Sequence, residues 1–423
     1  MSCARSLALW ALAALVPLLL AACGGGGGGT AIAVPAPACT VASTANTAGM
    51  ASNALRLVVD SGPTCTEVNR LYASVTVCQP GNAANCQTID HVLVDTGSTG
   101  LRVFANVLLP ALALPRVNGS TPGRPLFSCA QFVDGSYAFG PVAVADIKLS
   151  GETAASAPIQ VIADPAFSGL GGACSPSGSA LSSASVLGAN GIIGLGFFKE
   201  DCGLGCTNNA NNGFYYTCTS NACTSITGDV AANAKQIKNP VALFATNNNG
   251  LTIDLPVVNL SGAPSASGTL TFGIGTQANN APPGGASVMT TTPVGNIGTL
   301  FQSQSMNASF IDTGSNGLYF GVSAFPLCTG GFSSFYCPVS RTVLGATLFG
   351  ANAASKAVAF TIDNVISLFT PASVGLAVFP TMSGPIGSNN IFDWGLPFFF
   401  GRKVVIGIEG STSALGTGPL IAF

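Results

Sequence analysis

The chain carries two copies of a short acidic motif, and each copy directly follows an apolar run. The copies are Asp95-Thr96-Gly97-Ser98-Thr99-Gly100-Leu101 and Asp312-Thr313-Gly314-Ser315-Asn316-Gly317-Leu318. Six of the seven positions are identical, and the two aspartates are 217 residues apart. One such motif could simply be an Asp-initiated turn at the end of a strand. Two copies in the same setting indicate an internal duplication.

Paired motifs of this kind can do acid–base chemistry. If the halves pack about a pseudo-two-fold axis, the Asp95 and Asp312 carboxyls meet, and they then share one proton because both cannot ionise easily. One carboxyl can take a proton from a water while the other donates a proton to a substrate carbonyl oxygen. This chemistry needs no metal and no cofactor. We expect the hydroxyls of Ser98 and Ser315 to bond the outer carboxylate oxygens. Thr96 and Thr313 should lock the two turns to each other. Gly97 and Gly314 should let the backbones approach closely.

The elements that would position these turns are predicted to be short strands. Apolar, β-branched runs of strand length recur between turn residues. They are Leu55–Val59, Tyr72–Val77, His91–Val94, Val142–Leu149, Ile159–Ile162, Leu270–Ile274, Val358–Ile362 and Val404–Ile408. One helix is expected within residues 229–245, ending near Asn239-Pro240. The stretch 275–287 is expected to link the halves, which gives an N-terminal lobe over 53–279 and a C-terminal lobe over 280–423.

Composition excludes several classes of protein. Of the 423 residues, 7% are charged, and 14 Lys+Arg against 16 Asp+Glu give a net charge of −2. No basic face for nucleic acid can be assembled from so few cations. The single histidine, His91, argues against a Ser-His-Asp or His-rich zinc site. The 53 Gly and 26 Pro favour strands and turns over long helices.

The N-terminus is expected to be a secretory signal and an anchor. Residues 6–22 are almost wholly apolar and follow Arg5, and they end in Leu20-Ala21-Ala22-Cys23. That ending resembles a bacterial lipobox, which implies cleavage after residue 22 and a lipid on Cys23; a plain signal peptide or an uncleaved helix is the alternative. Residues 23–52 would form the lipid anchor and a flexible tether. Gly24 after the cysteine suggests the outer membrane, with the domain facing the periplasm or the surface.

Cysteine usage agrees with export. Setting aside Cys3 and Cys23, twelve cysteines remain, an even number that suits disulfides in an oxidising compartment. The short-loop pairs Cys78–Cys86 and Cys328–Cys337 are plausible. The group Cys202, Cys206, Cys218 and Cys223 has a loosely zinc-like spacing. Disulfides are favoured there over a metal.

Beyond the paired turns, the chain resembles the two-lobed, pepsin-like aspartic peptidases from about residue 55 to its end. Residues 132–137, with the strand 146–149, resemble the flap hairpin, and residues 190–197 resemble the Gly-Ile-Ile-Gly-Leu-Gly segment behind the first catalytic turn. Residues 268–273 and 395–408 resemble later strands of the two lobes. The resemblance implies a mainly β, two-lobed barrel fold with pseudo-two-fold symmetry, in which Asp95 and Asp312 are catalytic. It also implies a flap built from Phe132, Asp134, Gly135, Ser136 and Tyr137.

The sequence departs from that family in two places. Phe132 stands where the flap usually has a tyrosine; Tyr137 is either a substitute or an ordinary hairpin aromatic. Gly395-Leu396-Pro397 replaces the usual Gly-Asp of the second lobe. For other polar residues the expectations are structural: His91 at a strand edge, Arg102 as a solvated or paired surface cation, and turn or strand-end positions for Asp60, Asp146 and Asp254.

Two functions follow as hypotheses. The first is a monomeric, membrane-anchored aspartic endopeptidase that hydrolyses a peptide or protein substrate with water activated between two aspartates. The second is an inactive binding module for a peptide or other ligand on the same fold, since a fold does not fix a function. A purely structural surface lipoprotein would leave the two intact turns unexplained.

Overall fold

The computed structural model describes residues 41–119, 123–170, 174, 178–208, 213–219, 222–225, 234–321 and 324–423. Its fold is mainly β, as the sequence indicates. The expected signal over residues 1–22, the lipidation site Cys23 and the tether up to residue 40 lie outside the described residues. In the described part of the chain, no helix combines the length and apolar character needed to cross a membrane.

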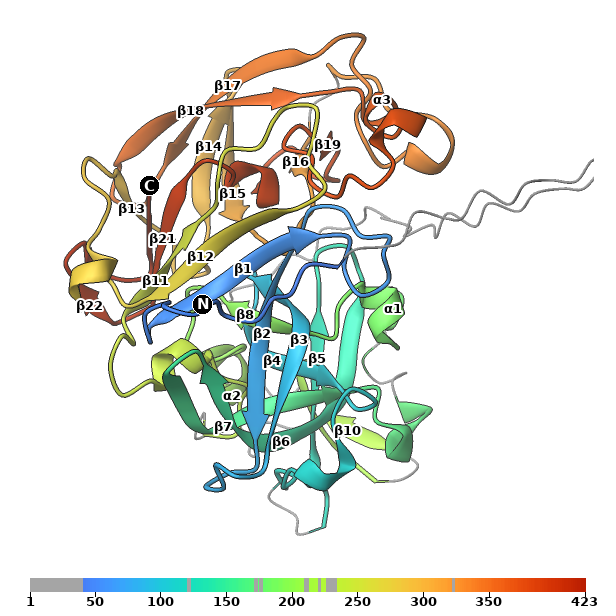
Figure 1. Ribbon diagram of the computed structural model, residues 1–423, viewed down its shortest axis with the longest axis vertical. Coiled ribbons are helices and arrows are strands. Elements are labelled where there is room, and N and C mark those ends of the chain that lie inside the picture. The colour runs from blue at the N-terminus through green and yellow to red at the C-terminus, as the bar shows by residue number, and fades with distance from the viewer. Residues whose placement is uncertain are drawn as a thin grey trace, which may run out of the picture.

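Six strands of the N-terminal half close into a barrel. They follow the order β2-β3-β8-β4-β7-β6, and β6 pairs back to β2 through Val77 and Ile147. Their bounds are β2 (Arg70–Cys78), β3 (Cys86–Asp95), β4 (Thr99–Phe104), β6 (Tyr137–Leu149), β7 (Glu152–Ile162) and β8 (Gly191–Leu195). β4 and β8 are buried along their whole length, and β8 is accordingly a continuous apolar run rather than an alternating one. The barrel forms the lower part of the molecule in Figure 1.

The same sheet continues beyond the barrel in both directions. From β6 it extends through β5 (Leu126–Gln131), β9 (Tyr215–Cys218) and β10 (Cys223–Ser225). From β2 it extends through β1 (Ala54–Asp60), β12 (Ala266–Phe272), β11 (Gly250–Asp254), β21 (Lys403–Gly407), β24 (Leu420–Ala422) and β13 (Val288–Thr290). Strands from both sides of residue 280 therefore share one sheet, in which β11 pairs with β21 from Gly250↔Gly407 to Asp254↔Lys403.

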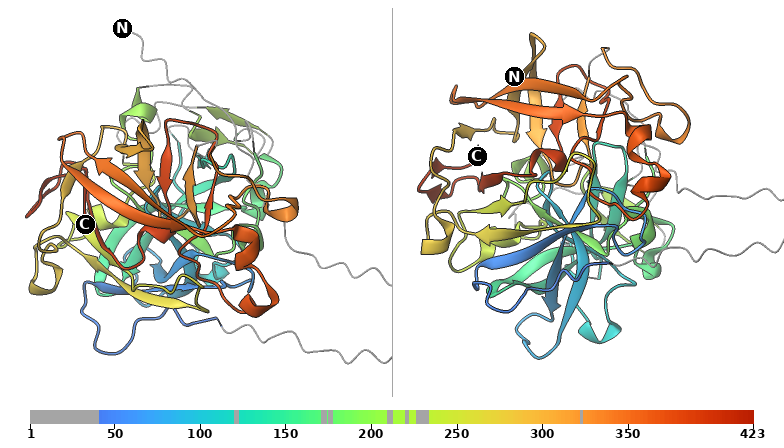
Figure 2. Two further views of the ribbon diagram at one scale, coloured as in Figure 1. Left: turned by 90° about the horizontal axis from the view of Figure 1, so that it is seen from above. Right: turned by 45° about the horizontal axis from the view of Figure 1, so that its top comes forward.

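A second, seven-stranded sheet forms a half-barrel in the C-terminal half. Its order is β18-β17-β14-β15-β20-β16-β19. The bounds are β14 (Ile297–Phe301), β15 (Gln304–Ile311), β16 (Leu318–Phe320), β17 (Thr342–Phe349), β18 (Ser355–Ile362), β19 (Ser383–Gly384) and β20 (Phe392–Trp394). A two-stranded ribbon pairs β22 (Thr412–Ser413) with β23 (Gly416–Thr417). In Figures 1 and 2 this sheet lies on the other side of β1, β11 and β12 from the barrel.

Helices are short. The α-helices are α1 (Ala184–Leu187), α2 (Leu204–Thr207) and α3 (Val365–Leu368). The 3₁₀ helices are η1 (Pro110–Leu112), η2 (Pro165–Phe167), η5 (Pro240–Leu243), η6 (Ala278–Asn280), η7 (Gly330–Phe332), η8 (Pro371–Ser373) and η9 (Leu396–Phe398). The helix expected within 229–245 is wrong for residues 234–239, while 229–233 lie outside the described residues. Gln236 bonds the backbone of Gly203 in both directions, so this segment lies extended against residues 200–203.

The expected strands are all present. Each predicted run coincides with one of β1, β2, β3, β6, β7, β12, β18 and β21, although β12 and β21 each end before the last predicted residue. Residues 275–287 hold turns and η6 but no strand. The disulfides Cys78–Cys86 and Cys328–Cys337 are confirmed. The four cysteines with zinc-like spacing form Cys202–Cys206 and Cys218–Cys223, and a further disulfide joins Cys129 to Cys174.

Three expectations for charged residues are wrong. Arg102 is not at the surface: it is buried on β4 and paired with Asp201 at 3.2 Å. His91 is not at a strand edge: it lies buried within β3, with Nε2 3.2 Å from Asp60 and Nδ1 3.1 Å from Asp90. Tight side-chain pairing explains both, since a buried charge needs a partner. Asp60 and Asp254 do end strands, while Asp146 lies inside β6, where it accepts hydrogen bonds from Gly81 and Ser156.

The His91 cluster also fastens the start of the described chain. Asp60 accepts a hydrogen bond from the Ala42 amide at 2.8 Å, and the Thr44 hydroxyl bonds Asp90. Burial alone would lower the pKa of His91, but hydrogen bonds to Asp60 and Asp90 and the charges of these carboxylates outweigh burial and raise it to about 9. The imidazolium therefore stabilises the fold at neutral pH.

We expect His91→Asn to lower the free energy of unfolding by on the order of 2 kcal/mol near pH 6. A raised pKa contributes stability that is complete below the unfolded value of about 6.5 and is lost as pH rises through about 9. The deficit should therefore shrink between pH 6.5 and 9.5 in urea unfolding. Asp254→Asn, which removes the exposed pair with Lys403, should stay within about 0.5 kcal/mol. A deficit that does not change with pH would contradict the assigned pairing.

Candidate active site

Each acidic turn joins two strands that are held apart by a third. β3 leads into the first turn and β4 leaves it; β8 lies between them, parallel to β3 and antiparallel to β4. In the second half β20 lies in the same way between β15 and β16. The two strands that flank each turn pair with the strand between them and not with each other. The turn therefore lies at the end of these strands, where it can contact the opposite turn.

A glycine on each inserted strand lets the turn close against it. A Cβ atom on Gly194 would lie 2.4 Å from the Thr99 nitrogen, and one on Gly395 would lie 2.1 Å from the Gly317 oxygen. No side chain fits at either position. Gly194 belongs to the segment 190–197 and Gly395 begins the segment 395–408, so a glycine of each segment lies directly against one of the two turns.

The structure brings the two predicted aspartates together. A Cβ on Gly97 would lie 3.0 Å from the Asp312 carboxyl, and one on Gly314 would lie 2.8 Å from Oδ1 of Asp95. The two turns are supported alike: the Gly97 amide donates to Asp95 Oδ1 at 2.8 Å, and the Gly314 amide donates to Asp312 Oδ1 at 2.7 Å. Glycine is required at both positions because any side chain would enter the space between the carboxyls.

Serine hydroxyls bond the second oxygen of each carboxyl, as expected. Ser98 donates to Asp95 Oδ2, and Ser315 donates to Asp312 Oδ2 at 2.7 Å. Each carboxyl is thus held by one amide and one hydroxyl. Because the two sets of donors match, the two carboxyls face each other.

Reciprocal threonine bonds cross-link the turns. The Thr96 amide donates to Thr313 Oγ1 at 3.1 Å, and the Thr313 amide donates to Thr96 Oγ1 at 3.0 Å. Each hydroxyl then donates onward to the opposite strand, Thr96 to the Ile311 oxygen and Thr313 to the Val94 oxygen. Both threonines are buried. This network fixes the spacing between the two aspartates.

The electrostatics of the pair favour one shared proton. Burial, the charge of Asp95 and a hydrogen bond with Asp95 raise the pKa of Asp312 to about 8, against lowering contributions from the Ser315 hydroxyl and the Gly314 amide. The pair therefore keeps one proton at neutral pH, so that a carboxylate and a carboxylic acid are present side by side. That is the protonation state that general acid–base chemistry needs.

Three polar residues near the pair were not predicted from the sequence. Asp393 of β20 is buried, and its pKa is raised well above the ordinary value by burial, by Asp312 and by Asp95. Arg70 donates to the Gly314 oxygen at 3.1 Å and pairs with Glu67. Tyr319 of β16 bonds Asn316 at 2.5 Å. The one sequence signal was for Asp393, an acid inside the apolar run Ile391–Trp394; Arg70 reaches the second turn through its bond to Gly314, 244 residues away in the chain, which no local pattern reveals.

The predicted flap residues form a hairpin tip between β5 and β6. Phe132 and Ser136 close the turn through a 2.9 Å backbone bond, and the Asp134 carboxylate accepts from the Ser136 amide and hydroxyl. Gly135 has the positive φ that this turn requires. Burial raises the pKa of Tyr319, with smaller contributions from the charges of Asp393 and Asp134. The tip thus lies within electrostatic reach of the second half.

The two hairpin aromatics pack inward. Phe132 packs against the cluster that contains Tyr72 and Ile192. Tyr137 is 8% exposed and packs with the Cys129–Cys174 disulfide. This packing beside the disulfide favours an ordinary hairpin aromatic over a substitute for the flap tyrosine.

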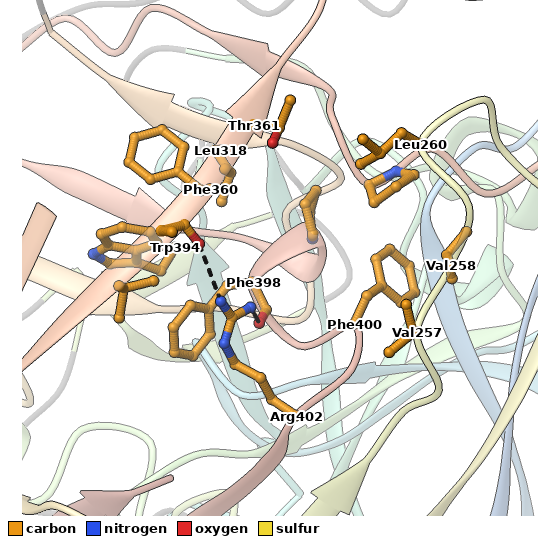
Figure 3. Close-up of a pocket in the computed structure, with 14 residues that line it drawn as sticks. Val257, Val258, Leu260, Leu318, Phe360, Thr361, Trp394, Phe398, Phe400 and Arg402 are labelled. Atoms are coloured by element: carbon orange, nitrogen blue, oxygen red, sulfur yellow. Dashed lines mark hydrogen bonds between the residues drawn. The ribbon is translucent and has the colours of Figure 1, made fainter. Parts of the chain in front are cut away.

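An apolar cavity of about 190 Å³ lies behind the second turn (Figure 3). Its walls include Leu318, Trp394, Phe398 and Phe360, and Arg402 donates to the backbone oxygens of Phe398 and Ala359 beside it. Trp394 faces this cavity, and side chains alternate along a strand, so the neighbouring Asp393 points to the other face of β20. The cavity is thus separate from the paired carboxyls.

Among the described residues, no group of three or more His, Cys, Asp or Glu side chains is arranged to hold a metal ion. Asp95, Asp312 and Asp393 thus do not form a metal cage.

A family model described as a protein of unknown function, DUF3443, matches residues 49–423. The match covers both turns, both sheets and the hairpin, and the chain belongs to this family. No curated protein is similar enough to the chain to be matched to it.

The threonine cross-link yields a prediction on stability. Thr96→Val would leave the buried Thr313 amide without its acceptor, and we expect a loss of about 1–3 kcal/mol in the free energy of unfolding. Thr313→Val should behave alike. The double variant should lose less than the sum, because each single change already breaks the reciprocal pair. Thr88→Val, at an exposed pair with Thr76, is the control and should stay within about 0.5 kcal/mol. Additive losses in urea unfolding would contradict the reciprocal network.

Proposed function

We propose that this DUF3443 protein is an aspartic endopeptidase, in which Asp95 and Asp312 activate a water for attack on a peptide bond. One observation carries the proposal: two carboxyls from duplicated turns face each other under matched amide and hydroxyl support. A structural role alone does not explain why like charges are held together at such a position, since their repulsion destabilises the fold.

The proposed reaction uses the single proton of the pair. The carboxylate takes a proton from the water, whose oxygen forms a bond to the carbonyl carbon, while the carboxylic acid gives its proton to the carbonyl oxygen. The tetrahedral intermediate then collapses: the carbon–nitrogen bond breaks and the leaving nitrogen takes the proton of the carboxylic acid. The carbonyl re-forms as one hydroxyl of the intermediate gives its proton to the carboxylate, so the pair again holds one proton. Gly97, Gly314, Ser98 and Ser315 hold the carboxyl planes in place. The cross-link through Thr96 and Thr313 keeps their spacing constant.

The proposal includes a two-lobed, pepsin-like fold with pseudo-two-fold symmetry. It is supported by the identical strand insertion behind both turns and by the reciprocal threonine bonds. An extended peptide would lie between the halves, beneath the hairpin tip Phe132–Ser136, and exchange backbone hydrogen bonds with it. No cofactor enters the reaction, and the chain would act as a monomer.

The proposed location is the cell envelope, with the chain as a lipid-anchored outer-membrane protein facing the periplasm or the surface. The disulfides of the described residues support export. An enzyme in that compartment must work near neutral pH, and the raised pKa of Asp312 provides the protonated partner there.

The alternative function is a binding module, and the hairpin favours it. Phe132 has no hydroxyl and Tyr137 is turned toward a disulfide, so the tip offers no phenol to a substrate. Such a module would bind a peptide between the halves without cleaving it.

The full chain, exported so that its disulfides form, is incubated with a mixed peptide library between pH 4 and 8, and products are read by mass spectrometry. Asp95→Asn and Asp312→Asn should each reduce cleavage at least about 1000-fold, because neither leaves a carboxyl pair that shares a proton. Asp254→Asn, far from the turns on β11, should keep full activity. Folded wild-type protein that binds peptides but cleaves none would refute the enzyme and favour the binding module.

The pH profile is expected to extend unusually high. Because the pKa of Asp312 is raised to about 8, the proton on the pair is retained through neutral pH and lost as pH rises through that value. Cleavage of a library-derived peptide should therefore fall on the alkaline side with an apparent pKa near 8. A decline complete by pH 6 would contradict the electrostatic description of the pair.

A further inference from the structure

The first acidic turn is followed by a buried arginine, whereas the matching position of the second half holds a tyrosine. The repeated motif stops at Leu101 and Leu318, and the next residues are Arg102 and Tyr319. Arg102 lies on β4 and is only 3% exposed. Burying a guanidinium destabilises a fold unless hydrogen bonds and an opposite charge compensate it. The groups that compensate Arg102 therefore indicate what this residue holds in place.

The guanidinium of Arg102 bonds the end of the first turn. Its Nη1 donates to the Thr99 oxygen at 2.6 Å. Ser98 directly precedes Thr99, and the Ser98 oxygen accepts from the Gly196 amide at 3.0 Å. The hydroxyl of this same serine donates to Asp95. Arg102 therefore fixes the backbone one residue beyond the serine that supports the first carboxyl.

Asp201 compensates the charge of Arg102. Nη2 of Arg102 donates to Asp201 Oδ2 at 3.2 Å, and the Asp201 side chain is 7% exposed. Burial raises the pKa of Asp201 to about 6, against lowering contributions from the charge of Arg102 and a hydrogen bond from Tyr215. The Asp201 carboxyl is therefore ionised at neutral pH. The two residues form a buried ion pair that adjoins the first turn.

The segment that carries Asp201 packs against the same residue as the turn does. Asp201 directly precedes the loop closed by the Cys202–Cys206 disulfide. Its amide donates to the Ile237 oxygen at 3.0 Å. Ile237 also lies against the turn, because a Cβ on Gly100 would be 2.3 Å from Ile237 Cγ2. This shared contact restricts movement of the ion pair relative to the turn.

Tyr215 extends these contacts to the sheet of the hairpin. Its hydroxyl donates to Asp201 Oδ1 at 2.7 Å and accepts from the Ile237 amide at 2.7 Å. Tyr215 begins β9, which pairs with β5, and β5 leads into the hairpin tip. A continuous row of hydrogen bonds therefore runs from β9 through the ion pair to the end of the first turn.

The second turn is held differently. Tyr319, at the position that matches Arg102, donates its hydroxyl to Asn316 Oδ1 at 2.5 Å, within the same turn. The Gly314 oxygen accepts from Arg70 at 3.1 Å. The buried ion pair and the disulfide loop beside it are thus features of the first turn, at a point where the duplicated halves differ.

We propose that Arg102 and Asp201 are positioning residues of the first acidic turn. The ion pair holds the Thr99 carbonyl in place, and Tyr215 anchors the pair to the sheet that carries the hairpin. The support of the first carboxyl therefore depends on these contacts as well as on the opposite turn. Fixed catalytic groups raise kcat because they need no reorganisation during the reaction. This inference rests on the proposed function for its effect on cleavage.

A double variant separates positioning from stability. Arg102→Met alone and Asp201→Asn alone should each lower the urea midpoint at pH 7, because each leaves a buried charge without its partner. R102M/D201N removes both charges and should regain most of the midpoint. On a library-derived peptide, its kcat should still be about tenfold below wild type with KM within about twofold, since the Thr99 carbonyl has lost its donor. Recovery of kcat together with the midpoint would show that the pair only stabilises the fold and would overturn the proposal.

The matched control is an ion pair beside β18 in the C-terminal half. Arg341 Nε lies 2.9 Å from Asp363 Oδ2. R341M/D363N also removes an arginine and its aspartate, and it should keep kcat within about twofold of wild type. A loss of kcat equal to that of R102M/D201N would show that the effect is not specific to the first turn and would overturn the proposal.

A second measurement depends neither on turnover nor on a change of charge. Tyr215→Phe removes the hydroxyl that donates to Asp201, and Tyr216→Phe removes the next hydroxyl along β9, which bonds the Gly213 oxygen at 3.4 Å. Hydrogen exchange is followed by mass spectrometry. Y215F should speed exchange in peptides covering residues 95–104 by about three- to tenfold and leave those covering 312–320 unchanged, while Y216F should change neither.

The exchange result separates the two proposals. Exchange in the first turn that is unchanged in Y215F, or that speeds up equally in both turns, would overturn the positioning role. A folded wild-type protein that cleaves no peptide but shows the exchange effect in the first turn alone would refute the endopeptidase and support the positioning role.

Discussion

The repulsion between two buried carboxyls is the constraint around which this structure is arranged. Holding Asp95 and Asp312 face to face disfavours the doubly ionised state, and the fold offsets this with amide and hydroxyl donors on the outer side of each group. Those donors act only if the turns stay in register. The buried threonine bonds between the turns supply that register, and each threonine hydroxyl ends on a strand of the other half.

The sheets hold the two turns in a fixed relative position. The inserted strands β8 and β20 press against their turns at glycines where no side chain fits, so a turn cannot shift without moving a strand. The strands β21, β24 and β13 of the C-terminal half continue the sheet that contains the N-terminal barrel. Relative motion of the halves would therefore have to bend a shared sheet as well as break the bonds between the threonines. This rigid connection keeps the distance between Asp95 and Asp312 constant, which a reaction shared by two side chains requires.

Much of this arrangement is readable from the sequence because it is local or repeated. The duplicated motif identified both aspartates, and the apolar runs identified the strands that carry them. Short loops predicted Cys78–Cys86 and Cys328–Cys337. The failures have one physical origin, namely partners that are distant in the chain. His91 is buried because Asp60, 31 residues earlier, pairs with it, and Arg102 is buried because Asp201 does so. The helix expected near residue 236 gave way to bonds with Gly203, which no local propensity encodes.

The duplication is most informative where the copies differ. Matched positions in the two halves carry Asp and Asp, Thr and Thr, Ser and Ser, and Gly194 and Gly395, so shared chemistry explains them. Ile192 against Asp393 breaks the match at a buried site, where a polar group is costly unless it has a partner. A carboxyl at such a position either only destabilises the fold or also acts on the neighbouring pair of aspartates. Burial and the charges of Asp312 and Asp95 raise the pKa of Asp393, so this carboxyl is coupled electrostatically to the pair at a position where the two halves differ.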